Sequence, residues 1–169
     1  SDSFEVSVDP RSLQTLKLRD TLVVKTDKNE IFSIPVSADR LVGTLVAAST
    51  VSGAWVVERS PYHVLNDISI RARDSLIVGQ GVTVQFEGNY TLSVPQGTKL
   101  SIRGTRSEKV VLTSKDSTSI WGGIRFLQSG ADDTIACAII ENCSYSSDDL
   151  GGAIYCLDSS PTIMQSVIR

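Results

Sequence analysis

Short runs of alternating hydrophobic and polar residues follow one another along most of the chain. No window has the 3.6-residue apolar spacing of an amphipathic helix. Alternation with a period of two is typical of half-buried β-strands, because successive side chains of a strand point to opposite faces. We therefore predict an all-β protein whose strands, from Trp55 onward, lie at 62–72, 75–78, 82–86, 90–94, 98–102, 109–113, 120–127, 134–140, 152–156 and 161–168.

Several segments of this strand-rich part repeat one another, and turn signals rather than helices separate the copies. The matching segments are 75–84 with 91–100, 121–126 with 150–155, and 140–143 with 163–166. Short β-rich repeats predict the coils of a solenoid, in which each unit buries its apolar face by stacking on the next. With coils of about 20 to 25 residues, the segment 53–169 would form roughly five coils.

The first 52 residues have a different pattern. About five short strand-like runs are separated by turn signals, and together they make roughly half the length of an immunoglobulin-type sandwich. We expect 1–52 to form a small β-rich module or a cap over the first coil, with the boundary in the small, polar segment 49–53. The runs are 4–8, 16–18, 22–25, 31–36 and 41–46.

Specific motifs in the strand-rich part carry a family resemblance. The motifs are Ser60-Pro61-Tyr62, Ser75-Leu76-Ile77-Val78, Gly81-Val82-Thr83-Val84-Gln85-Phe86, Leu100-Ser101-Ile102-Arg103-Gly104-Thr105, Val110-Val111-Leu112-Thr113-Ser114 and Trp121-Gly122-Gly123-Ile124. In this order they resemble the opening of secreted bacterial right-handed parallel β-helix proteins, the pectin-lyase-like superfamily. Gly151-Gly152-Ala153-Ile154-Tyr155-Cys156 is similar to repeats of bacterial surface β-helix adhesins.

This resemblance implies a right-handed parallel β-helix over 53–169. It also implies an extracellular or cell-surface location, with a signal peptide removed. The resemblance indicates the fold but not the function, because the same superfamily includes lyases, hydrolases and adhesins. We expect the β-helix to be truncated or uncapped after Arg169.

Composition narrows the set of partners. The formal net charge of −3 gives no basic surface for a nucleic acid. No apolar run approaches the roughly 18 residues of a membrane span. Three cysteines form no zinc-binding spacing. They are interpreted as small buried thiols, although a Cys137–Cys156 or Cys143–Cys156 disulfide stays open.

Acidic residues gather in the loops that follow successive strands, where they could converge along one edge of the solenoid. The residues are Asp132, Asp133, Asp148, Asp149 and Asp158. Aspartate in such loops usually satisfies nearby backbone groups. Two facing carboxylates could instead hydrolyse a glycoside, and several could hold a structural Ca²⁺, although no calcium-loop motif is present.

A polyuronate lyase is disfavoured, because such an enzyme needs a basic residue and cations beside its substrate, whereas Arg125 and Arg169 alone are basic after Trp121. Tyr145 is the best candidate for an exposed ring on which a sugar could stack.

The leading hypothesis is a non-catalytic binding or structural module for a polysaccharide or surface glycan, without catalytic residues or a cofactor. Its binding residues would be Asp132, Asp133, Tyr145, Asp148, Asp149 and Asp158. One alternative is a fragment of a polysaccharide-degrading enzyme, a glycoside hydrolase rather than a lyase. Another is a structural subunit that associates end to end through unpaired strand edges.

Overall fold

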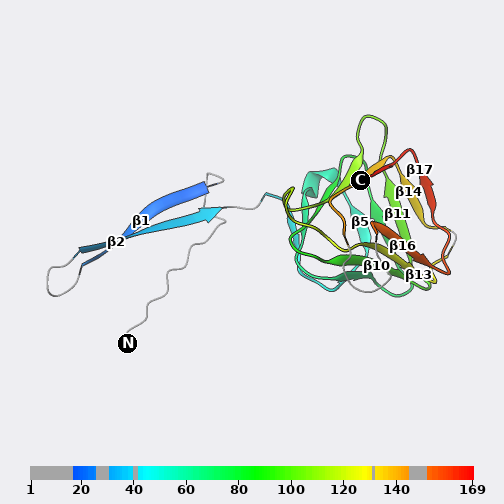
Figure 1. The fold of residues 1–169 in the computed structure, drawn as a ribbon, viewed down its shortest axis with the longest axis horizontal. Helices are drawn as coiled ribbons and strands as arrows, with labels where there is room; N and C mark the ends of the chain where they lie inside the picture. Colours follow the sequence, from blue (N-terminus) through cyan, green and yellow to red (C-terminus); the bar gives the residue numbers. More distant parts are fainter. Residues whose placement is uncertain (1–16, 26–30, 40–41, 131, 145–151) are drawn as a thin grey trace. The chain divides into compact units, whose positions relative to one another are not determined.

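The computed structural model describes residues 17–25, 31–39, 42–130, 132–144 and 152–169. These residues form β-strands and one short 3-10 turn, η2 (Val57–Arg59), which confirms the all-β prediction. The chain divides into two compact units, Ser1–Val42 and Gly43–Arg169 (Figure 1).

The first unit contains an antiparallel hairpin. Strand β1 (Lys17–Lys25) pairs with β2 (Ile31–Asp39), and Leu22 lies opposite Ile34. Residues 17–18 and 22–25 of the predicted runs are parts of one longer strand, whereas residue 16 and the run 4–8 lie outside the described residues. Phe32 and Ile34 are exposed on β2.

The second unit consists of three parallel sheets, in which each strand pairs with the strand three places earlier or later in the chain. Sheet 1 contains β4 (Thr50–Val51), β7 (Ile68–Ile70), β10 (Thr91–Pro95), β13 (Gly123–Leu127) and β16 (Ile154–Leu157). Sheet 2 contains β5 (Gly53–Trp55), β8 (Ser75–Val78), β11 (Lys99–Arg103), β14 (Thr134–Ala136) and β17 (Thr162–Met164). Sheet 3 contains β3 (Thr44–Val46), β6 (Tyr62–Val64), β9 (Thr83–Phe86), β12 (Val110–Ser114), β15 (Ala138–Ile140) and β18 (Val167–Ile168). This strand order is that of a parallel β-solenoid.

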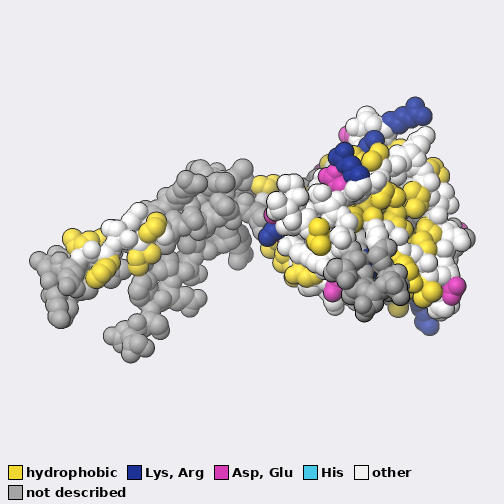
Figure 2. Space-filling view, viewed as in Figure 1, with side chains coloured by type: hydrophobic (Ala, Val, Ile, Leu, Met, Phe, Trp, Pro, Cys, Tyr) yellow, Lys and Arg dark blue, Asp and Glu magenta, His cyan; other side chains and the backbone are white. Residues whose placement is uncertain are grey.

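The core is a set of aliphatic ladders that run from coil to coil. Parallel neighbours point to the same side of a sheet, so an apolar residue at one position stacks on an apolar residue at the same position of the next coil. Leu76 lies beside Leu100 in sheet 2, and Leu112 lies beside Ile140 in sheet 3. All four are buried. Figure 2 also shows hydrophobic side chains over β11 and β14 on the surface.

Two stacked aromatic pairs belong to the core. Phe86 and Trp121 stack with their ring centroids 4.1 Å apart, and Trp55 and Tyr62 stack at 4.6 Å. Trp121 is fully buried. Stacked rings of this kind contribute both apolar burial and a defined geometry.

Gly123 permits the close approach of two coils. Its φ of +79° is a conformation that L-residues rarely adopt. A Cβ added there would lie 2.5 Å from the carbonyl oxygen of Ala153, in the next coil. The glycine is therefore required by both the backbone conformation and the coil spacing.

Residues that match in the internal repeats are not the residues that pair between strands of adjacent coils. Leu76 matches Leu92 in the repeat, yet Leu76 pairs with Leu100. The repeat instead relates two successive sides of the coils, because β8 belongs to sheet 2 and β10 to sheet 1. In the 121–126 repeat, Ile124 pairs with Ile154, one residue beyond the position that the match indicated.

Three predicted strands are each divided in the structure. The run 62–72 contains β6 of sheet 3 and β7 of sheet 1. The run 134–140 is split into β14 and β15 by Cys137, whose φ of +50° turns the chain from sheet 2 to sheet 3. Gln165, with a φ of +51°, divides the run 161–168 in the same way. Single-residue corners of this kind carry no Gly or Pro signal in the sequence.

The first strands of the solenoid lie within the segment that the sequence analysis assigned to the N-terminal module. Strand β3 pairs with β6, and β4 pairs with β7. The division between the two units therefore falls after Val42, earlier than the expected boundary at residue 52.

Candidate functional site

Three of the predicted binding residues lie in corners that join sheet 1 to sheet 2. Asp132 and Asp133 follow β13, and Asp158 follows β16. The two corners are adjacent, because the Ser129 amide donates to Ser159 Oγ at 3.0 Å. The other predicted residues, Tyr145, Asp148 and Asp149, lie outside the described residues.

Asp133 has a structural position within this corner. Its side chain is 1% exposed, and Oδ1 accepts a 2.7 Å hydrogen bond from the Leu100 amide of the preceding coil. Its carbonyl accepts from the Thr162 amide of the following coil at 2.8 Å. Asp132 and Asp158 are exposed. Asp133 therefore ties three coils together, which fits the backbone-capping interpretation of the loop aspartates.

Two buried oxygens in the same corner have no hydrogen-bond partner among the described residues: Asp133 Oδ2 and Ser129 Oγ. Buried polar atoms of this kind are commonly satisfied by an internal water. The described residues contain no group of three or more His, Cys, Asp or Glu side chains that could hold a metal ion. The predicted structural Ca²⁺ stays a prediction.

We expect Asp133→Ala to lower the free energy of unfolding by about 1–3 kcal/mol, because the Leu100 amide would be buried without an acceptor. Asp133→Asn keeps an oxygen at that position and should cost less. Urea denaturation followed by circular dichroism measures both. The neighbouring exposed variant Asp132→Ala should stay within about 0.5 kcal/mol of wild type, and an equal loss in both variants would contradict the assigned role.

A different group of polar side chains forms a continuous row on the outer face of sheet 3. His63 of β6 lies beside Gln85 of β9, and Gln85 lies beside Thr113 of β12. Asn142, after β15, donates from Nδ2 to Thr113 Oγ1 at 3.2 Å. We call His63, Gln85, Glu87, Thr113 and Asn142 the polar row.

Glu87 orders the first part of the polar row. Its Oε1 lies 2.6 Å from His63 Nδ1 and accepts a 3.0 Å hydrogen bond from Gln85 Nε2. His63 is buried, whereas Gln85, Glu87, Thr113 and Asn142 are half-buried. The network therefore holds amide and hydroxyl groups in fixed positions at a partly open surface, which is the arrangement that preorganised binding requires.

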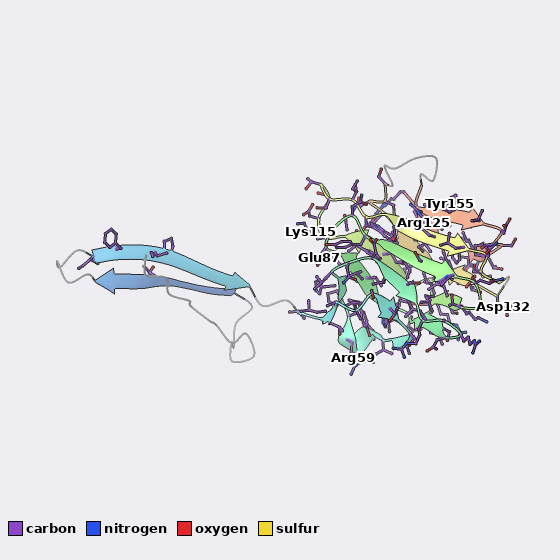
Figure 3. All side chains as sticks on the ribbon, turned by 90° about the horizontal axis from the view of Figure 1, so that it is seen from below. Arg59, Glu87, Lys115, Arg125, Asp132 and Tyr155 are labelled. Atoms are coloured by element: carbon purple, nitrogen blue, oxygen red, sulfur yellow. The ribbon has the colours of Figure 1, made fainter. Side chains whose placement is uncertain are left out.

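The polar row and the predicted acidic corner occupy different parts of the solenoid. Figure 3 shows Glu87 and the neighbouring Lys115 together at one side, with Asp132 at the other. The row was not predicted from the sequence, because no local motif joins its members. The polar residues at alternate positions of 62–64, 83–86 and 110–114 were visible, but their pairing depends on the register between coils.

Arg125 is a buried basic side chain outside the polar row. It lies on β13 beside Tyr155 of β16, and Figure 3 shows the two close together. Its Nη1 donates to the carbonyl oxygens of Ile124 at 3.2 Å and Gly152 at 3.0 Å. Arg125 thus joins two consecutive coils through backbone contacts.

All three cysteines are free thiols. Cys137 is buried, Cys143 is half-buried and Cys156 is exposed. Burial raises the pKa of the Cys143 thiol to about 12, with Arg125 opposing and Glu141 reinforcing the shift. Burial, with a contribution from Asp133, also raises the pKa of Cys156. Neither disulfide considered from the sequence is formed.

We expect Cys143 to react slowly with iodoacetamide in the folded protein, because the thiolate is the reactive form. At pH 8 a pKa of about 12 leaves roughly a thousandfold less thiolate than the ordinary value of 9.0. The raised pKa favours the folded state below pH 9, and this contribution is lost as the pH rises through about 12. Peptide mass spectrometry measures the rate, with the urea-unfolded chain as control. Equal rates in both states would contradict the burial of this thiol.

No helix among the described residues is long and apolar enough to cross a membrane. Comparisons of the chain with models of protein families, with curated protein sequences and with solved structures give no match.

Proposed function

We propose that this chain is a non-catalytic binding module, secreted or displayed on a bacterial cell surface, whose ligand is a polysaccharide or surface glycan. In this proposal the solenoid is a right-handed β-helix of roughly five coils, related to the pectin-lyase-like superfamily. Parallel strands joined by right-handed crossovers are the general rule, which supports the handedness. The observation that carries the functional proposal is the polar row.

Glycan binding suits the chemistry of the polar row. Sugar hydroxyls both donate and accept hydrogen bonds, and Gln85, Thr113 and Asn142 supply amide and hydroxyl groups that do the same. The Glu87 carboxylate is already in contact with His63 and Gln85. The three groups come from consecutive coils, which repeat at about 4.8 Å in parallel sheets. A periodic ladder of polar groups can follow an extended chain of sugars.

The test is native electrophoresis of the chain through gels cast with neutral and acidic polysaccharides. We expect one polymer to retard the wild-type chain without loss of its own staining. Gln85→Ala and Thr113→Val should reduce this retardation, whereas Ser93→Ala, a half-buried serine on the outer face of sheet 1, should not. Thermal unfolding of each variant checks that the fold is retained.

Three results would overturn the proposal. Retardation by no polymer would remove the glycan as ligand, and equal retardation of all variants would remove the polar row as its site. A cleared zone in the gel would instead support the glycoside-hydrolase alternative. Of the predicted aspartates that the structure describes, Asp133 caps a backbone amide, and Asp132 and Asp158 lie exposed in their corners.

A further inference from the structure

The corner between β13 and β14 contains a buried carboxylate and a buried hydroxyl that the polar row does not use. Asp133 is 1% exposed and Ser129 is 6% exposed. Neither Asp133 Oδ2 nor Ser129 Oγ has a hydrogen-bond partner among the described residues, so the two atoms are not bonded to each other either. Both belong to the corner 128–133, and we call these two atoms the corner oxygens.

The residues that carry the corner oxygens are fixed to the coils on both sides. Toward the preceding coil, Asp133 Oδ1 accepts a hydrogen bond from the Leu100 amide at 2.7 Å. Toward the following coil, the Asp133 carbonyl accepts from the Thr162 amide at 2.8 Å, and the Ser129 amide donates to Ser159 Oγ at 3.0 Å. A ligand of the corner oxygens would therefore meet a preorganised site.

Asp133 also brings a charge into this corner. No ion pair within the described part of the chain includes Asp133. A buried carboxylate is costly unless a cation or several hydrogen bonds compensate its charge, and the Leu100 amide bonds to only one of its two oxygens. Asn66 Oδ1 is another buried oxygen without a partner, but it belongs to a neutral amide that a water molecule would satisfy. At Asp133 a water molecule would leave the charge in place, whereas a metal cation would balance it.

We propose that the corner oxygens bind a hard metal cation, Na⁺ or Ca²⁺, which helps to hold consecutive coils together. Hard cations prefer oxygen ligands, and water molecules commonly complete their coordination. The described residues offer no group of three or more metal-binding side chains, so we expect a weak site, with a dissociation constant for Ca²⁺ of about 1 mM. A single positive charge already balances Asp133, which is why Na⁺ suits the site as well. This site is separate from the polar row and does not depend on glycan binding.

The first experiment is thermal unfolding of the full chain in choline chloride, with sodium chloride or calcium chloride exchanged in at constant ionic strength. We expect at least one metal ion to raise the Tm by about 3–6 °C at roughly ten times its dissociation constant. Asp133→Asn should remove most of this rise, because the variant keeps an acceptor for the Leu100 amide but loses the charge. Asp132→Asn removes an exposed carboxylate from the neighbouring position, so it is the matched control and should keep the rise.

A second measurement uses the wild-type chain and keeps the proposal testable if a variant unfolds. Isothermal titration calorimetry with calcium chloride and sodium nuclear magnetic resonance with sodium chloride each measure binding directly. We expect binding of at least one of the two ions, and the ion that binds identifies the natural ligand of the site. Ser129→Ala should weaken this binding about tenfold, because it removes one of the corner oxygens.

Three results would count against the cation. Binding of neither ion to the wild-type chain would mean that the corner oxygens hold only water, and would overturn the proposal. An equal rise of the Tm in wild type and Asp133→Asn would be a general salt effect, and would overturn it as well. Loss of the rise in Asp132→Asn would place the ion at the exposed carboxylate instead of the corner oxygens, with the same consequence.

Discussion

Replacing Trp121 by alanine is expected to lower the free energy of unfolding by about 3–5 kcal/mol, the usual cost of removing a fully buried large aromatic side chain. Trp121 stacks on Phe86 with an angle of 7° between the rings, and its Nε1 donates to the carbonyl oxygen of Glu141 at 2.8 Å. The change would leave a cavity between coils and an unpaired carbonyl. Urea denaturation, followed by circular dichroism, measures the loss.

The preceding residue provides a matched control. Ile120 is 42% exposed, so Ile120→Ala removes apolar atoms that are largely in water already. We expect its effect to stay near 0.5 kcal/mol, the usual range for surface substitutions. A comparable loss in the two variants would mean that Trp121 is not a core residue of the solenoid.

Gly123→Ala is expected to cost roughly 2–5 kcal/mol, of which about 1–2 comes from the left-handed backbone and about 1–3 from overpacking. The added methyl group would meet the Ala153 carbonyl oxygen at 2.5 Å. This contact is with backbone, so a side-chain rotation cannot relieve it. The coil that contains β16 would have to move away from β13. The same denaturation experiment measures the cost.

Gly130→Ala is the control for this second prediction. The nearest atom to an added Cβ at Gly130 is the Asp132 amide nitrogen at 4.0 Å, and the backbone there has no positive φ. Alanine should therefore be neutral or slightly stabilising at that position, because it restricts the unfolded chain. Similar losses at Gly123 and Gly130 would contradict the coil spacing described above.

The strands themselves could be predicted well from the alternating pattern. The predicted segment 75–78 has the bounds of β8, and 82–86 differs from β9 by one residue. The pattern works here because one face of each sheet is buried and the other is not. It fails at Cys137 and Gln165, where a single residue with positive φ turns the chain between two sheets.

The candidate site could be predicted only in part. That Asp133 lies in a corner followed from its loop composition, but its burial and its bond to Leu100 depend on the preceding coil. His63 and Glu87 lie 2.6 Å apart although they are far apart in sequence. Such contacts require the register between coils, which the internal repeats indicated incorrectly. Local patterns therefore predicted the strands, whereas the surface chemistry arises from stacking.

The corners of this solenoid vary in length while its ladders stay in register. The turn from sheet 1 to sheet 2 takes residues 96–98 after β10 but 128–133 after β13. Even so, Ile102 pairs with Ile135 in the next coil, as Leu100 pairs with Leu76 in the previous one. Lengthening a surface loop costs little entropy compared with the packing of a coil. New segments can therefore be inserted at these corners, by evolution or by grafting, while the ladders of the core keep their register.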